Sequence, residues 1–261
     1  MIKTVKIIFL AVGTFLLILF LLWNIAIPEE VLLNIITENS KTPYNHITFE
    51  ELNKGYFFDI TSKKANIFYG SLKEPLLIVE DVNVYLNLFS LLSLIPTVHF
   101  AAKTGEATLK GFYEITGNNA YEILVNNFQI AGHKGLNQIN IEGKGLVNIE
   151  IKGQSKRGDY KITVNQMQIK PILRAGVMVP FDKFDNIRGI GGFQNGVLYV
   201  KSLTFNGKGI QALAKGSVSK NKLDMTIEII ATKDVSGYQF LDIALNKYKK
   251  SEGFYVVPLG S

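Results

Sequence analysis

The feature that most constrains the fold is an alternation of apolar and polar residues with a period of two. In the segment 147–151, valine and isoleucine at the odd positions alternate with asparagine and glutamate at the even ones. Successive side chains of a strand point to opposite faces of a sheet, so this pattern predicts strands with one apolar and one solvated face. The alternation recurs in 107–115, 160–164 and 223–229. We therefore expect an all-β protein built on a long, curved antiparallel sheet.

The apolar positions of three of these predicted strands define one candidate site, a possible apolar groove. Its residues are Val147, Ile149, Ile151, Ile162, Val164, Leu223, Met225 and Ile227. A packed core and an open groove would both produce this alternation, so the sequence leaves the two alternatives open. In the segment 76–86 the same pattern groups Ile78 with Val82 and Val84, and Glu80 interrupts it.

Near the N-terminus, residues 7–27 carry no charge. A helix of this length extends about 31 Å, enough to cross a hydrocarbon core. Lys3 and Lys6 precede the run and acidic residues follow it, so the positive-inside rule places the N-terminus in the cytoplasm. We expect residues 1–6 in the cytoplasm, a transmembrane helix at 7–27 and a periplasmic β domain over 28–261. A cleaved signal peptide is the alternative, but the run is longer than usual for one and no A-x-A-like site follows.

Three short helices are predicted among the strands. Residues 29–38 begin after a proline with acidic residues in the first turn, and they form an amphipathic segment suited to a membrane surface. Residues 87–95 are rich in leucine and stop at a proline. Residues 237–249 follow a capping-box pair, Ser236 and Gln239, and carry an apolar stripe with lysines at the end.

The residues that usually carry chemistry do not form a recognisable constellation. The chain has no cysteine, and His46, His99 and His133 are widely separated, which favours surface or turn positions over metal binding. Its glycine pairs do not match a phosphate-binding loop. Lysine and arginine are scattered, and the formal net charge is +6, so a nucleic-acid groove is not indicated. We expect no catalytic residues, no cofactor, no metal site and no nucleic-acid partner.

Residues 180–218 carry the one resemblance to a known family. They contain PFDKFDNIRG, then NGVLYVKSL, then KGSV. This order of parts resembles the C-terminal repeat of the type II secretion system protein N family, which is related to the AsmA-like membrane-anchored β proteins. The resemblance extends more weakly back to about residue 75 and forward to the C-terminal GFYVVPLGS, whereas residues 40–70 match poorly.

The resemblance implies an inner-membrane, single-pass protein whose periplasmic bulk is a half-barrel. It also implies an accessory, non-enzymatic role in type II protein secretion, with secretion-machine proteins as partners. The AsmA relationship implies an alternative, a lipid-binding or lipid-transfer module that holds phospholipid acyl chains on its apolar concave face.

Overall fold

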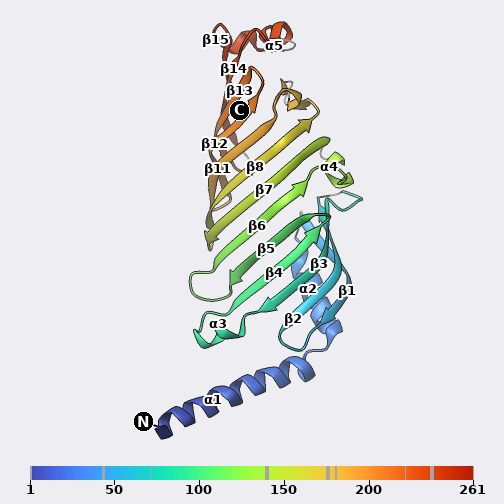
Figure 1. The fold of residues 1–261 in the computed structure, drawn as a ribbon, viewed down its shortest axis with the longest axis vertical. Coiled ribbons are helices and arrows are strands. Elements are labelled where there is room, and N and C mark those ends of the chain that lie inside the picture. The colour runs from blue at the N-terminus through green and yellow to red at the C-terminus, as the bar shows by residue number, and fades with distance from the viewer. Residues whose placement is uncertain are drawn as a thin grey trace. The chain divides into compact units, whose positions relative to one another are not determined.

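The computed structural model describes most of the chain (Figure 1). The described residues are 2–42, 45–70, 72–138, 141–174, 177–179, 181–220, 222–235 and 238–260. They divide into two compact units, unit 1 over Met1–Lys103 and unit 2 over Thr104–Ser261. The described chain is mostly antiparallel sheet, as the prediction of an all-β fold requires, and unit 1 also contains substantial helix.

Unit 1 combines N-terminal helices with a small sheet in which neighbours in sequence are neighbours in space. Its elements are α1 (Ile2–Leu21), the π-helix η1 (Leu22–Ala26), α2 (Glu29–Ser40), β1 (Asn45–Lys54), β2 (Asp59–Tyr69), β3 (Leu77–Leu86), α3 (Leu88–Leu92) and β4 (Thr97–Thr104). The strand order is β1-β2-β3-β4, and α2 packs beside β1.

Unit 2 contains a larger sheet that is also built from sequential hairpins. Its strands are β5 (Ala107–Glu114), β6 (Ala120–Gln129), β7 (Gly143–Gln154), β8 (Arg157–Ile169), β11 (Asn186–Gln194), β12 (Val197–Gly207), β13 (Ile210–Val218), β14 (Leu223–Ala231), β16 (Phe254–Leu259) and β15 (Lys249–Ser251), in this spatial order. A separate hairpin and four short helices complete it: β9 (Ile172–Arg174) with β10 (Val177–Val179), α4 (Lys134–Gln138), η2 (Phe181–Lys183), α5 (Tyr238–Leu245) and η3 (Asn246–Tyr248).

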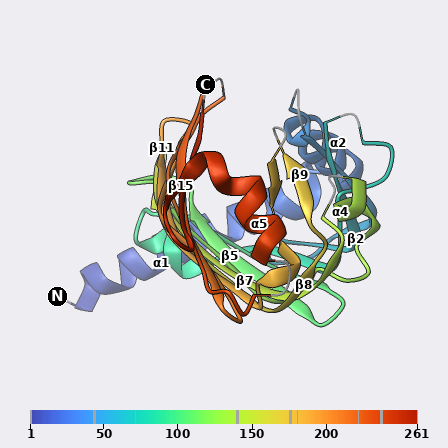
Figure 2. The same ribbon diagram turned by 90° about the horizontal axis from the view of Figure 1, so that it is seen from above.

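The sheet of unit 2 is curved, and α5 lies on its concave side (Figure 2). Beneath this helix the buried apolar residues form one cluster that includes Val164, Ile187, Tyr255 and Leu245. Tyr255 is fully buried. The main core of unit 2 therefore lies where α5 meets β7 through β16.

Among the residues that the structure describes, no single helix is both long enough and apolar enough to cross a membrane. The segments Leu10–Ala26 and Glu29–Ser40 satisfy the requirement only as a pair, and they are bent by 91° relative to each other. The transmembrane helix predicted at 7–27 is not confirmed as a single span and stays a prediction.

The predicted short helices are present, with corrected ends. α2 continues two residues beyond the predicted 29–38. The predicted helix at 87–95 is shorter, because Leu94 adopts a left-handed conformation with φ of 59° that a helix cannot contain. In place of the single helix predicted at 237–249, the structure has α5 followed by η3. Lys249 already belongs to β15. The capping residue Ser236 lies outside the described residues.

Candidate functional site

The strand register of unit 2 places the eight residues of the predicted groove on one face of the sheet. Ile149 is opposite Ile162, and Val147 is opposite Val164. Directly opposed residues of antiparallel strands project from the same face, so the pairing can be followed from strand to strand. From Ile162 it continues through Gly189, Leu203 and Ala214 to Ile227.

Four such rows cross the sheet from β5 or β6 to β14 or β16, and each is named here by its residue on β8. The Val164 row contains Phe128, Val147, Val164, Ile187, Phe205, Ala212, Ile229 and Tyr255; the Ile162 row contains Leu109, Val125, Ile149, Ile162, Gly189, Leu203, Ala214, Ile227 and Val257; the Tyr160 row contains Gly111, Ile123, Ile151, Tyr160, Gly191, Val200, Gly216, Met225 and Leu259; the Gly158 row contains Tyr113, Tyr121, Gly153, Gly158, Phe193, Leu198, Val218 and Leu223. All of these residues are uncharged. We call the four rows together the uncharged face.

Exposed side chains lie at one margin of the uncharged face, although Ala214, Val257 and Val200 in the two middle rows are buried. Val164 is 5% exposed and belongs to the core beneath α5. Ile162 and Met225, in the next two rows, are half-buried. In the Gly158 row, Leu198 is 39% exposed and Leu223 is 42% exposed. The face is thus a closed core along one margin and an accessible apolar surface along the other.

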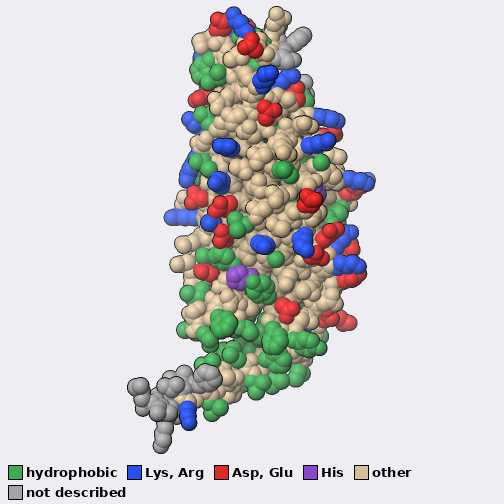
Figure 3. All heavy atoms as spheres, in the orientation of Figure 1, with side chains coloured by type: hydrophobic (Ala, Val, Ile, Leu, Met, Phe, Trp, Pro, Cys, Tyr) green, Lys and Arg blue, Asp and Glu red, His purple; other side chains and the backbone are tan. Residues whose placement is uncertain are grey.

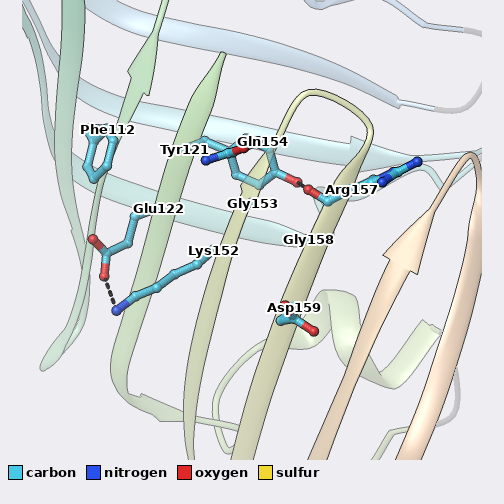
Figure 4. A pocket seen from close by; sticks show the side chains of 9 residues that line it. All are labelled: Phe112, Tyr121, Glu122, Lys152, Gly153, Gln154, Arg157, Gly158 and Asp159. Carbon is cyan, nitrogen blue, oxygen red and sulfur yellow. Dashed lines mark hydrogen bonds and ion pairs between the residues drawn. The ribbon is translucent and has the colours of Figure 1, made fainter. Parts of the chain in front are cut away.

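Glycines in the accessible rows allow aromatic rings to lie across the sheet. A Cβ atom at Gly153 would lie 2.3 Å from the Tyr121 hydroxyl, and one at Gly158 would lie 2.5 Å from Phe193 Cζ. The two rings are 6.3 Å apart, and the Tyr121 hydroxyl donates to the Arg157 carbonyl at 3.0 Å (Figure 4). Partial burial raises the pKa of Tyr121, so it stays neutral. The accessible margin is therefore shallow and lined by aromatic rings.

The opposite face of the same strands is solvated and bears paired charges. Lys152 forms ion pairs with Glu122 at 3.0 Å and with Glu150 at 2.8 Å. The hydrogen bond between Lys152 and Glu150 raises the pKa of Lys152 and lowers the pKa of Glu150. A cavity of about 430 Å³ adjoins this network at the β7–β8 turn (Figure 4). Glu122, Lys152 and Asp159 in its lining are ion-paired, and Tyr121, Gly153 and Gly158 of the uncharged face also line it.

The histidines occupy structural positions. His46 stacks on Phe68 with ring centroids 4.4 Å apart, and His133 stacks on Phe128 at 4.6 Å. His99 stacks on Tyr85 at 5.2 Å. Within the described ranges, no three side chains of His, Cys, Asp or Glu gather closely enough to hold a metal ion.

One polar cluster was not predicted from the sequence. Asp242 of α5 accepts a hydrogen bond from the buried Tyr255 hydroxyl at 2.5 Å and from Lys249 at 2.8 Å. These residues come from α5, β15 and β16, so the cluster ties the helix to the edge of the sheet. The sequence signal was weak, since the three lie in separate elements at irregular spacing.

The Asp242 cluster predicts a loss of stability in acid. Hydrogen bonding to Lys249 and then to Tyr255 lowers the pKa of Asp242. A carboxylate with a depressed folded pKa contributes stability above its unfolded pKa of about 4, and the contribution disappears as the pH falls through the folded value. We expect Asp242→Asn to lower the urea midpoint at pH 7 and to lower it less at pH 3.

The control is Asp224→Asn, which removes an exposed ion pair with Lys222 at 3.3 Å. Exposed pairs of this kind contribute little, so its midpoint should follow the wild-type value at both pH values. An equal effect of Asp242→Asn at pH 3 and pH 7 would show that the charge of Asp242 does not hold α5.

The chain matches no protein-family model, no curated protein and no solved structure. The resemblance to the secretion protein N family therefore rests on the sequence patterns themselves, chiefly those of residues 180–218. In the structure this stretch runs from η2 through β13, in the middle of the unit 2 sheet.

Proposed function

We propose that this chain is a non-enzymatic protein, anchored in the inner membrane by residues 7–27, whose periplasmic sheet holds the acyl chains of phospholipid. The observation that carries the proposal is the uncharged face, whose Gly158 row exposes Tyr113, Leu198 and Leu223 while most of the Val164 row is buried. Contiguous apolar surface of this kind is uncommon on a protein without a hydrophobic ligand or partner.

The chemistry of the accessible margin suits a long apolar ligand. Its side chains are aliphatic or aromatic, and the Tyr121 hydroxyl is already bonded to a backbone carbonyl. A ligand that lies along these rows needs no hydrogen bonds and gains about 0.8 kcal/mol for each methylene removed from water. Glycines under the rings keep the surface low, so an extended chain has a continuous path across several strands.

A second candidate function is assembly within the type II secretion machinery, as an accessory inner-membrane component. The sequence resemblance over 180–218 supports this role. One structural observation also favours it: β1 stands at the end of the strand order and pairs on one side with β2. An edge strand is a place where an extended segment of a partner protein can add to a sheet.

A photo-crosslinking experiment in cells separates the two candidates. A photoreactive amino acid is placed at Leu198 or Met225 on the uncharged face, and at Thr226 as the control. Thr226 adjoins Met225 on β14 and is exposed on the solvated face. We expect lipid adducts at Leu198 and Met225 in several-fold excess over Thr226.

Protein adducts at all three positions without lipid adducts would overturn acyl-chain binding and favour assembly. Lipid adducts of equal yield at Thr226 would mean that labelling reflects membrane proximity rather than the uncharged face.

A further inference from the structure

Three segments of unit 1 meet at one end of its sheet. They are the end of the N-terminal helix, the β1–β2 turn at 55–58 and the β3–β4 connection at 87–96. The Trp23 indole donates to the Gly55 carbonyl at 2.7 Å, and the Phe20 and Phe57 rings are 5.6 Å apart. The Leu86 amide donates to the Phe58 carbonyl at 3.0 Å, which places the β3–β4 connection beside the turn.

This end exposes large apolar side chains from two different turns. Phe89 and Leu94 are each 83% exposed, and Tyr56 is 75% exposed. We define the apolar rim as Tyr56, Phe57, Phe89, Leu92 and Leu94. Hydrophobic side chains gather visibly at this end of unit 1, where the N-terminal helix joins it (Figure 3).

Hydrogen bonds from backbone amides to polar side chains hold the two turns in the conformations that project the apolar side chains outward. In the first turn, the Asp59 carboxylate accepts from the Phe57 amide at 3.1 Å. In the second, the Asn87 side chain accepts from the Phe89 amide at 3.1 Å. The polar groups thus face inward to the backbone, and the apolar groups face the surroundings.

The charges nearest the rim are also directed inward. Lys54 donates to the carbonyl oxygens of Trp23 and Ile27, and its ammonium lies 4.8 Å from the Trp23 ring centroid. The sequence from Asn87 to Ala102 contains no lysine, arginine, aspartate or glutamate. The rim contains no charged residue, is continuous with the uncharged segment 7–27 and is bordered by tyrosine and tryptophan, which is the composition of a membrane interface.

We propose that the apolar rim inserts into the interfacial layer of the bilayer that holds residues 7–27. The proposal rests on the anchoring role given to those residues under the proposed function. The rim would then fix unit 1 against the lipid surface by contacts beyond the helix itself. It also gives the exposed Phe89 and Leu94 an environment in which their side chains leave water.

The chain contains no cysteine, so each single-cysteine variant of the full chain carries one label at a chosen position. Spin labels are placed at Phe89→Cys and Leu94→Cys, at Leu10→Cys within the helix, and at Lys73→Cys as the control. Lys73 is exposed in the β2–β3 turn, at the opposite end of β2. The protein is reconstituted in vesicles of phosphatidylethanolamine and phosphatidylglycerol, and collisions with oxygen and a water-soluble nickel chelate are measured.

We expect the labels at residues 89, 94 and 10 to favour collisions with oxygen, and the label at residue 73 to favour the chelate. Rim labels that report water while residue 10 reports lipid would overturn the rim proposal and leave the anchor standing. Water at residue 10 as well would overturn the anchor and the rim together. Rim labels that are aqueous in vesicles but shielded in native membranes would assign the rim to a protein partner and overturn the proposal.

Discussion

Replacement of Val164 by aspartate is expected to prevent stable folding of unit 2. Val164 lies on β8 between β7 and β11, opposite Val147 on one side and Ile187 on the other, and is 5% exposed. Its neighbours in the Val164 row are apolar, so a carboxylate there has no partner. A buried charge without compensation costs about 3 to 5 kcal/mol, which is a large share of the stability of a typical domain.

The matched control places the same side chain one residue away. Thr163 points to the solvated face, where its neighbours in the register are Asn148 and Arg188. We expect Thr163→Asp to cost about 1 kcal/mol or less, the range of strand propensity, with Arg188 offsetting part of it. The measurement is urea denaturation of the purified full chain, followed by the circular dichroism of the strands. Equal loss at both positions would contradict the assignment of the two faces.

The sequence predicted these faces because the central strands are regular. In β7 and β8, the alternation from 147 to 151 and from 160 to 164 runs without interruption, so parity alone identifies the buried side. Parity depends only on the pleat and needs no knowledge of the neighbouring strand. The register that joins these strands to β14 depends on hairpin geometry and had to come from the structure.

Prediction failed where a bulge changes the phase of the alternation. In β3 the pattern grouped Ile78 with Val82, but the structure buries Val79 and turns the chain at Asp81, which has φ of 50°. The register confirms the change, since Val79 faces Ala65 and Val82 faces Ser62. Both of these partners are buried. One irregular residue on each strand therefore changes the parity of the inward positions, from odd at Val79 to even at Val82 in β3 and from even at Ser62 to odd at Ala65 in β2.

A similar shift in parity explains why the β1–β2 hairpin was not predicted from the sequence. In β1, Ile47 and Phe49 share one parity, but Glu51 has φ of 52° and is skipped in the pairing, after which Leu52 takes the next position. A short segment with such a shift has no clear period of two.

The apolar rim was not predicted for a different reason: leucines in the segment 87–96 look the same in sequence whether they cap a core or face outward.

The C-terminal cluster lies beyond any local pattern, and it leads to the second large effect. Tyr255 on β16 is fully buried and contacts the core that α5 covers. Its hydroxyl donates to Asp242, so the ring fills space and the oxygen holds the helix. Tyr255→Ala removes both functions and leaves a cavity beneath α5. Truncation of a large buried aromatic residue costs about 3 to 5 kcal/mol, so we expect a correspondingly lower urea midpoint.

Tyr255→Phe separates the two contributions, because it keeps the ring and removes only the hydroxyl. Asp242 retains its contact with Lys249 in this variant, so the loss should be smaller than that of Tyr255→Ala. Hydrogen exchange provides the local measurement: amides of α5 should exchange faster in both variants, and those of β7 should change only in the alanine variant.

If Tyr255→Ala left the exchange of α5 unchanged, the helix would be held by contacts other than this cluster. If the phenylalanine variant lost as much stability as the alanine variant, the hydroxyl, and not the packing of the ring, would dominate, since only the hydroxyl is absent from both.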